Sequence, residues 1–152
     1  MRYWLMKSEP DVYSIDDLER DGTTHWDGVR NHQAKNFMRD DMAVGDRVLY
    51  YHSNAKPPGV AGVAEVVRAG YPDHTAQDPD SKYYDPRATP EAPRWFMVDI
   101  AFVEKLPRFV SLEELKGDPA LDDMLVTSRS RLSVQPVEEH HFRHVLEMAR
   151  DS

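Results

Sequence analysis

The sequence contains no cysteine among its 152 residues. A disulfide framework, a thiolate nucleophile and a cysteine-ligated zinc site are therefore all excluded. Long apolar runs are missing as well, since none approaches the roughly 20 residues that a membrane-spanning helix requires. The first residues lack the apolar stretch of a signal peptide, because Lys7, Ser8 and Glu9 interrupt it. These absences predict a cytoplasmic protein that does not contact a membrane.

Familiar catalytic and nucleotide-binding motifs are also missing. The chain has no G-x-S-x-G elbow, no P-loop and no G-x-G-x-x-G pattern. His52 and Ser53 are neighbours at a predicted strand end, so their side chains should point to opposite faces and cannot form a catalytic pair. We therefore expect a protein that is not an enzyme, with no catalytic residue and no cofactor.

The chain has a shortage of positive charge: 19 Lys and Arg residues stand against 27 Asp and Glu residues, for a formal net charge of -8. A strong nonspecific nucleic-acid binder needs net positive charge, because neutralising phosphates and releasing counterions supplies much of its affinity. That class is excluded for the chain as a whole. Residues 29–39 nevertheless hold Arg30, Lys35 and Arg39 with no acid, so a local basic face on an acidic body remains possible.

Short strands alternate with short helices along the chain. Period-two alternation and β-branched content predict strands at residues 2–7, 47–52, 60–68, 94–105 and 131–134. Capping boxes, apolar periodicity and a proline at a helix start predict helices at residues 15–20, 29–42, 112–117 and 136–149. Residues 23–28 read as a turn, residues 70–93 as a long functional loop, and residues 124–130 are ambiguous. We predict one α+β domain over residues 1–152, with a curved antiparallel sheet that closes into a β-barrel and short flanking helices.

Residues 26–34 are the first candidate site, because they place an aromatic ring, a turn glycine, a cation and two carboxamides ahead of a helix. Trp26 could stack on a planar heterocycle while Asn31 reads its edge and Arg30 supplies charge. Equally, Trp26 could anchor the core and Asn31 could cap the helix. The residues alone leave both interpretations open.

Further candidates lie at strand ends and in loops. Lys7 and Ser8 follow the first strand, and Ser53 follows another. Tyr84 lies in the loop segment 81–86, which pairs two tyrosines with a cation. Arg129 and Arg131 could each meet a phosphate or neutralise nearby acids. On the terminal helix, His140 and His144 have the i, i+4 spacing of a metal pair, but no third ligand is evident, and we expect no metal.

Taken together, these segments resemble the EVE domain family. The ordered matches are residues 4–10, 26–34, 45–54, 62–66, 83–86, 93–95 and 131–134. They cover the chain from residue 2 to about 148, and the ordered set is far more specific than any one segment. His32 stands where many relatives carry tyrosine.

The resemblance implies a PUA-like β-barrel related to the YTH readers of methylated RNA bases. It further implies a non-catalytic reader of a flipped-out modified base, of the 5-methylcytosine or 5-hydroxymethylcytosine type, in DNA or RNA. By the same resemblance Trp26 stacks on the base, and Asn31 and Ser53 bond its edge. The residues implied to line the pocket or meet the backbone are Lys7, Ser8, Tyr84 and Arg131.

Two other functions stay open from the sequence. One is a small-molecule or protein-interaction module that uses the same cavity. The other is a hydrolase or a base-modifying enzyme that uses His52 or Asp27 as a base. The expected partner is nucleic acid with a modified base, single-stranded or flipped out, with a protein partner also possible, and the chain is assumed to be a monomer.

Overall fold

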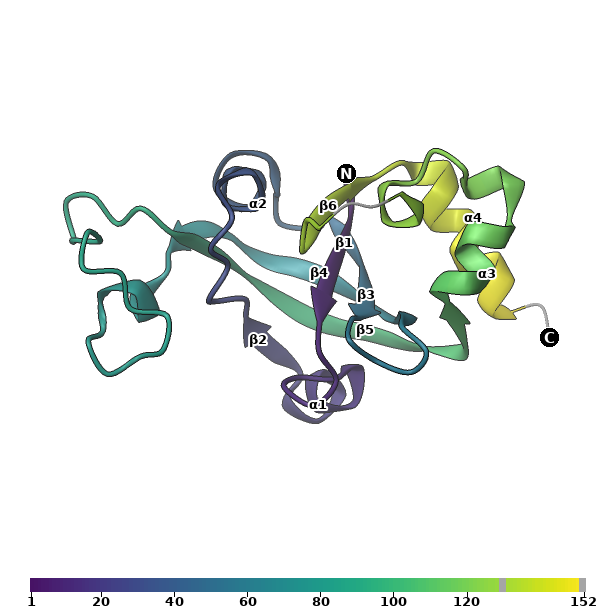
Figure 1. Cartoon of the computed structure of the whole chain (residues 1–152), viewed down its shortest axis with the longest axis horizontal. Helices are drawn as coiled ribbons and strands as arrows, with labels where there is room; N and C mark the ends of the chain where they lie inside the picture. The colour runs from purple at the N-terminus through teal and green to yellow at the C-terminus, as the bar shows by residue number, and fades with distance from the viewer. Residues whose placement is uncertain (129–130, 151–152) are drawn as a thin grey trace.

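Six strands form one sheet in the computed structural model, which describes residues 1–128 and 131–150. The strand order is β2-β5-β4-β3-β1-β6 (Figure 1). The strands are β1 (Tyr3–Ser8), β2 (Thr23–His25), β3 (Arg47–His52), β4 (Gly59–Pro72), β5 (Phe96–Ser111) and β6 (Val134–Val137). β1 and β3 run parallel, and every other neighbouring pair is antiparallel.

The α+β class is confirmed, but the expectation of an antiparallel sheet is wrong in one respect. The chain crosses over from β1 through a helix, β2 and a second helix before it enters β3, and this crossover returns β3 in the same direction as β1. Within the described strands the sheet has two free edges, β2 and β6, so closure into a barrel is not confirmed.

Within the part of the chain that the structure describes, four α-helices accompany the sheet. They are α1 (Ile15–Asp21), α2 (His32–Asn36), α3 (Leu112–Gly117) and α4 (Glu139–Arg150). The capping boxes predicted at Ser14 and Ser111 are both present, each with the serine hydroxyl accepting from an amide three residues on. None of the helices within residues 1–128 and 131–150 is long and apolar enough to cross a membrane.

Two predicted helices have different bounds in the structure. The predicted helix 29–42 begins only at His32, because Asn31 caps it, and it widens after Asn36 into one π-helical turn in which Met42 N donates to Phe37 O at 2.9 Å. The terminal helix begins at Glu139, because Pro136 lies in β6. A proline fits there since β6 is an edge strand.

The remaining boundaries differ at strand ends and in loops. The predicted turn 23–28 contains β2, and the predicted strand 131–134 gives way to β6, which begins at Val134. The long loop starts later than expected, because β4 continues to Pro72, and it opens with a 3-10 turn, His74–Gln77. Leu125–Thr127 forms another 3-10 turn, whereas Arg129 and Ser130 lie outside the described residues.

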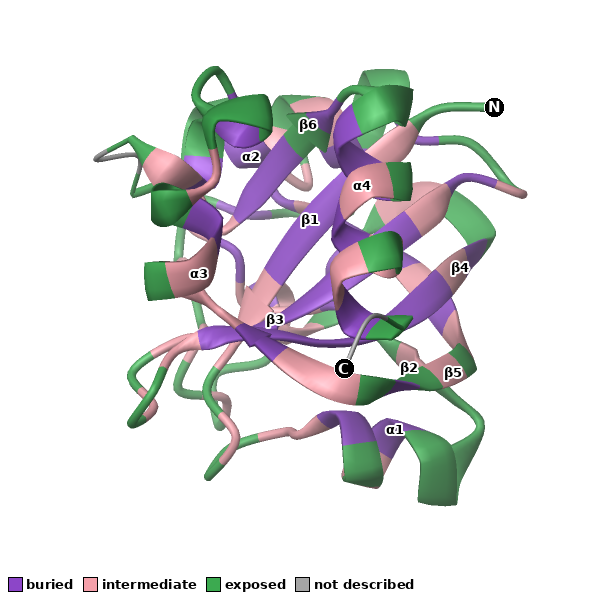
Figure 2. Cartoon of the chain, turned by 90° about the vertical axis from the view of Figure 1, so that its right-hand side faces the viewer, coloured by how far each residue is buried: buried purple, intermediate pink, exposed green. Residues whose placement is uncertain are grey.

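The core lies on both faces of the sheet. Successive residues of a strand point to opposite sides, so Trp4 and Tyr50 join one buried cluster while Leu5 and Leu49 join another. Figure 2 shows α3 and α4 lying over the second of these faces, and their buried apolar residues belong to the same cluster as Leu5 and Leu49. We call the first side the pocket face and the second the helix face.

Candidate functional site

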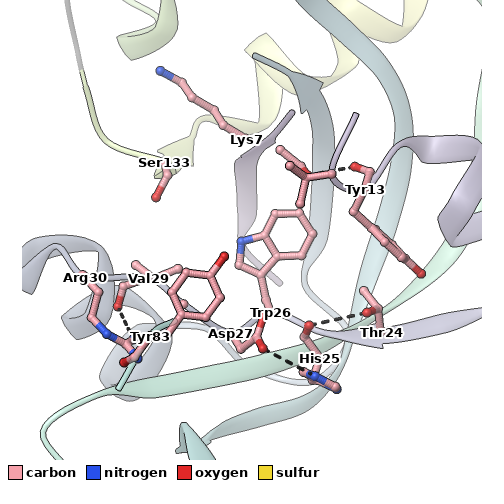
Figure 3. A pocket seen from close by; sticks show the side chains of 13 residues that line it. Lys7, Tyr13, Thr24, His25, Trp26, Asp27, Val29, Arg30, Tyr83 and Ser133 are labelled. Atoms are coloured by element: carbon pink, nitrogen blue, oxygen red, sulfur yellow. Dashed lines mark hydrogen bonds and ion pairs between the residues drawn. The ribbon is translucent and has the colours of Figure 1, made fainter. Parts of the chain in front are cut away.

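A cavity of about 390 Å³ opens beside the pocket face, at the C-terminal end of β1. Figure 3 shows Lys7 and Ser133 on one side of it, with Trp26 and Tyr83 on the other. Its volume lies within the range of ~300–1,000 Å³ that small-ligand pockets occupy. The lining residues are Lys7, Ser8, Val12, Tyr13, Thr24, His25, Trp26, Asp27, Gly28, Val29, Arg30, Tyr83 and Ser133.

Trp26 belongs both to the core and to the cavity wall. Its side chain is buried in the pocket-face cluster, with the indole edge-on to the ring of Tyr50 at 5.6 Å between centroids and 89° between planes. Its backbone N donates to Val98 O at 2.8 Å, which continues the pairing of β2 with β5. Trp26 is therefore a core residue whose ring also lines the cavity, and its stacking on a ligand stays a prediction.

Tyr83 enters the cavity wall from the long loop, and Gly28 makes room for its ring. Gly28 has a φ of +76°, and a Cβ there would lie 2.6 Å from Cζ of Tyr83. Any side chain at position 28 would therefore strain the backbone and displace the tyrosine ring. The turn glycine noted in the sequence serves to place a distant aromatic ring.

A buried carboxylate connects the two sides of this wall. Asp73 accepts from Gly28 N at 2.8 Å and from Arg30 Nη1 at 3.2 Å, while Arg30 Nη2 donates to Tyr83 O at 2.6 Å. Burial by itself raises the pKa of Asp73, but hydrogen bonds from Thr75, Gly28 and Arg30 outweigh burial and lower it. Asp73 thus stays ionised and holds the tryptophan turn and the tyrosine loop in one arrangement.

The opposite wall carries polar groups at the end of β1. Ser8 Oγ donates to Tyr13 O at 2.8 Å, and Ser8 O accepts from Ser53 N at 3.0 Å. Lys7 N donates to Ser133 O at 2.8 Å, and Lys7 Nζ lies 5.7 Å from the ring centroid of Tyr51. Burial lowers the pKa of Lys7. The Ser133 hydroxyl therefore lies across the cavity from the two aromatic rings, whereas the Lys7 ammonium lies beside Tyr51 of the helix-face cluster.

Of His52 and Asp27, the two residues considered as catalytic bases, only Asp27 lines the cavity. His52 is outside the cavity lining, and its Nε2 accepts a hydrogen bond from Ile15 N at 3.1 Å, so the lone pair a base would use is occupied. Burial lowers the pKa of His52. Asp27 lines the cavity, with Oδ2 3.7 Å from Nε2 of His25.

Of the eight predicted site residues, four line the cavity and four do not. Lys7, Ser8, Trp26 and Arg30 line it, and they come from β1 and from the segment between β2 and α2. Asn31 instead caps α2, where its Oδ1 accepts from Ala34 N at 2.9 Å. The backbone N of Ser53 donates to Ser8 O. Tyr84 and Arg131 are both exposed. The functional roles assigned to all eight stay predictions.

Sequence reasoning missed three of the residues that form or hold the wall. The sequence predicted Tyr84 as a site residue, but its neighbour Tyr83 lines the cavity. No periodic pattern in an irregular loop indicates which of the two tyrosines faces inward. Ser133 lies in the segment 131–134, from which only Arg131 was predicted as a site residue. Asp73 had no signal of its own beyond its place at the start of the loop.

Comparison with known proteins gives a consistent result. A family model described as "EVE domain" matches residues 2–148. Thymocyte nuclear protein 1 from Homo sapiens is 42% identical over 166 residues, covering 96% of this chain and 73% of that protein. The crystal structure of human THYN1 protein in complex with 5-methylcytosine-containing DNA is similar at a TM-score of 0.93 and 41% identity, covering 100% of this chain and 99% of that one. A hypothetical protein from Leishmania major reaches a TM-score of 0.94 and 51% identity, covering 99% and 96%.

Proposed function

This chain belongs to the EVE domain family, and on that premise we propose that it is a non-catalytic reader of a modified nucleobase. The base is of the 5-methylcytosine or 5-hydroxymethylcytosine type and enters the cavity unpaired, from DNA or RNA. The observation that carries the proposal is the cavity walled by Trp26 and Tyr83, in a chain whose full length aligns with a protein crystallised with 5-methylcytosine-containing DNA.

The chemistry of the two walls suits a planar base. Each aromatic ring can stack face-on against a base, which contributes about 1–3 kcal/mol per base. Ser8 and Ser133 both line the cavity, where the Ser133 hydroxyl can donate to or accept from the edge of a heterocycle and the Ser8 hydroxyl, which donates to Tyr13 O, can still accept. A methyl group added to the base would be accommodated by the apolar surfaces of Val12 and Val29, which also line the cavity.

The charge balance favours weak, base-focused binding. Extruding a base from a duplex costs a few kcal/mol, comparable to what stacking returns. With a formal net charge of -8, the chain gains little from phosphate neutralisation to offset that cost. We therefore expect a preference for single strands or for bases that are already poorly paired.

The predicted site residues divide into two groups in this proposal. Lys7, Ser8, Trp26 and Arg30 act at the base or hold its wall, because they line the cavity. Asn31, Ser53, Tyr84 and Arg131 lie outside the lining. Contacts from Tyr84 and Arg131, both exposed, would fall on the flanking backbone rather than on the base.

A binding titration on matched oligonucleotides tests the proposal. Single-stranded and duplex oligonucleotides that differ in one 5-methylcytosine are titrated by fluorescence anisotropy against the wild type and against Trp26→Ala. We expect the modified single strand to bind best and Trp26→Ala to weaken it about 5- to 150-fold, which corresponds to about 1–3 kcal/mol of stacking.

The matched control is Met38→Ala, a truncation in the same buried cluster that does not line the cavity. It should lower the melting temperature while leaving the affinity of the folded protein unchanged. Equal binding of modified and unmodified oligonucleotides, or unchanged binding by Trp26→Ala, contradicts the proposal. A change in oligonucleotide mass on incubation would instead establish an enzyme.

A further inference from the structure

Three metal-ligating side chains gather on the helix face, away from the nucleobase cavity. Asp123, His140 and His141 each place one possible ligand atom within 4.8 Å of the others. The two histidines lie in the first turn of α4, and Asp123 lies just ahead of the 3-10 turn Leu125–Thr127. Figure 1 shows α4 at the opposite end of the molecule from the loop that carries Tyr83.

This cluster differs from the pair that helical spacing suggested. His144 is not the partner of His140, because its Nε2 lies 2.7 Å from Asp118 Oδ2. The ring of His140 instead lies beside that of His141, with 4.1 Å between centroids. Adjacent residues on a helix rarely converge, and the carboxylate from a separate segment supplies the third ligand that the sequence did not reveal.

His141 provides a rigid anchor for such a site. Its side chain is only 3% exposed, and its Nε2 lies 2.8 Å from Asp123 Oδ1. A divalent ion could take the place of the proton shared by these two atoms. His140 and Asp123 are 64% and 75% exposed at their side chains, so they have room to close around an ion.

Glu138 adds the outer contact that histidine ligands of metals commonly make. Its Oε2 lies 3.3 Å from Nδ1 of His140, which leaves Nε2 of that ring as the nitrogen available to a metal. Glu138, His141 and Asp123 also line a hollow of about 310 Å³, which gives an ion and its water ligand a way in.

We propose that Asp123, His140 and His141 bind a divalent transition metal ion of the zinc type. Two imidazole nitrogens and one carboxylate oxygen form a ligand set that zinc accepts, with water in the fourth position. Calcium and magnesium are disfavoured, because they prefer sites made of oxygen ligands. The bound ion would join the start of α4 to the segment before Leu125, and this role is independent of base recognition.

Calorimetric titration of the full chain with zinc chloride, after removal of metal by a chelator, tests the site. We expect one zinc ion per chain. His140→Ala and Asp123→Asn should each weaken binding by more than about 10-fold, since loss of an outer-shell partner alone typically costs about 10–100-fold. Glu138→Gln should weaken binding by about 10-fold for that reason. His140 and Asp123 are exposed, so the variants should fold.

His144→Ala is the matched control, because it removes a histidine from the same helix that belongs to a different pair. Its zinc affinity should equal that of the wild type. Titration with cobalt chloride should give the visible absorption of a tetrahedral site in the wild type and in His144→Ala, but not in His140→Ala. Absence of zinc uptake by the wild type, or equal uptake by His140→Ala and Asp123→Asn, overturns the proposal.

Discussion

The two faces of the sheet are buried to a similar extent but are built from different chemistry. The pocket face buries rings with polar ends: Trp4 Nε1 donates to Asp46 Oδ2 at 2.9 Å, and Tyr50 OH donates to Tyr13 O at 2.7 Å. The helix face is mainly aliphatic, with Leu49 and other leucines packed against α3 and α4. The arrangement of side chains on the pocket face therefore depends on hydrogen bonds, whereas that of the helix face depends mainly on the volume and apolar area of the packed side chains.

This difference between the two faces predicts which substitutions should weaken binding and which should lower stability alone. On the pocket face, the polar groups that hold the cavity wall also stabilise the fold, so removing one of them should lower stability and affinity together. On the helix face, stability should fall without a change in the affinity of the folded protein. Four measurements separate the two faces.

The largest effect is expected from Asp73→Ala. This buried carboxylate holds Gly28 and Arg30, so its removal leaves an uncompensated guanidinium and an unpaired amide. We expect a loss of about 3–5 kcal/mol in the free energy of unfolding, as for other broken buried pairs, together with loss of oligonucleotide binding. Urea unfolding and anisotropy measure the two. Asp78→Ala, which removes an exposed aspartate of the same loop, should change neither.

Leu49→Ala should have the next largest effect, on stability alone. Leu49 is fully buried on the helix face and is absent from the cavity lining. Truncation of a buried leucine costs about 2–5 kcal/mol. Urea unfolding should show this loss, while binding measured at low temperature should match the wild type. Weaker binding by the folded variant would show that the two faces are coupled.

Acid should open the loop of the pocket face before the strands of the core. A hydrogen bond from Trp95, followed by bonds from the Arg87 backbone and from Arg94, lowers the pKa of Asp85 from its usual 3.8 to about 2. The pKa of Asp73 is lowered as well. A carboxyl group with a depressed pKa in the folded state contributes stability that is present above its unfolded pKa and is lost as pH falls through the folded value.

The stability that ionised Asp85 contributes should therefore be lost between about pH 4 and about pH 2. Hydrogen exchange at about pH 4.5 and about pH 2.5 should show protection factors in residues 81–95 falling while those of β3 persist. Simultaneous loss of protection in both regions would contradict this order.

The smallest effect is expected from Tyr83→Phe, which keeps the ring against Gly28 and removes only the hydroxyl group. Affinity for the modified oligonucleotide should fall by about 0.5–1.5 kcal/mol if the hydroxyl bonds the base, or roughly 2- to 12-fold. The unfolding free energy should stay the same. A larger loss would indicate that the hydroxyl also orients the ring.

Elements with strong local signals could be predicted from the sequence. Arg47–His52 was predicted as a strand with the bounds it has, because its β-branched and aromatic residues are typical of a buried strand. The capping box at Ser14 likewise marked the start of α1. Thr23–His25 was predicted as part of a turn, and Val134–Val137 as the end of one strand and the start of a helix. Strands this short carry little periodicity and are defined by pairing with β5 and β1.

The site divides in the same way. Trp26 and Arg30 stand close together in one segment whose composition indicated a ligand site, and both line the cavity. Tyr83 could not be separated from Tyr84, because its direction depends on contacts with Gly28 and Arg30 far away in sequence. The role of Asp73 could not be predicted for the same reason. An aspartate at the start of a loop is common, and its partners Gly28 and Arg30 are distant in sequence.

The interior position of β1 has a consequence for synthesis of the chain. β1 lies between β3 and β6, so one of its edges is covered once residue 52 has been made and the other only when residue 137 follows. A nascent chain that lacks β6 presents an uncovered strand edge beside the cavity, which is the kind of surface that pairs with other chains. Ser133 lies directly ahead of β6, so the same late step that covers this edge also supplies the last residue of the cavity wall.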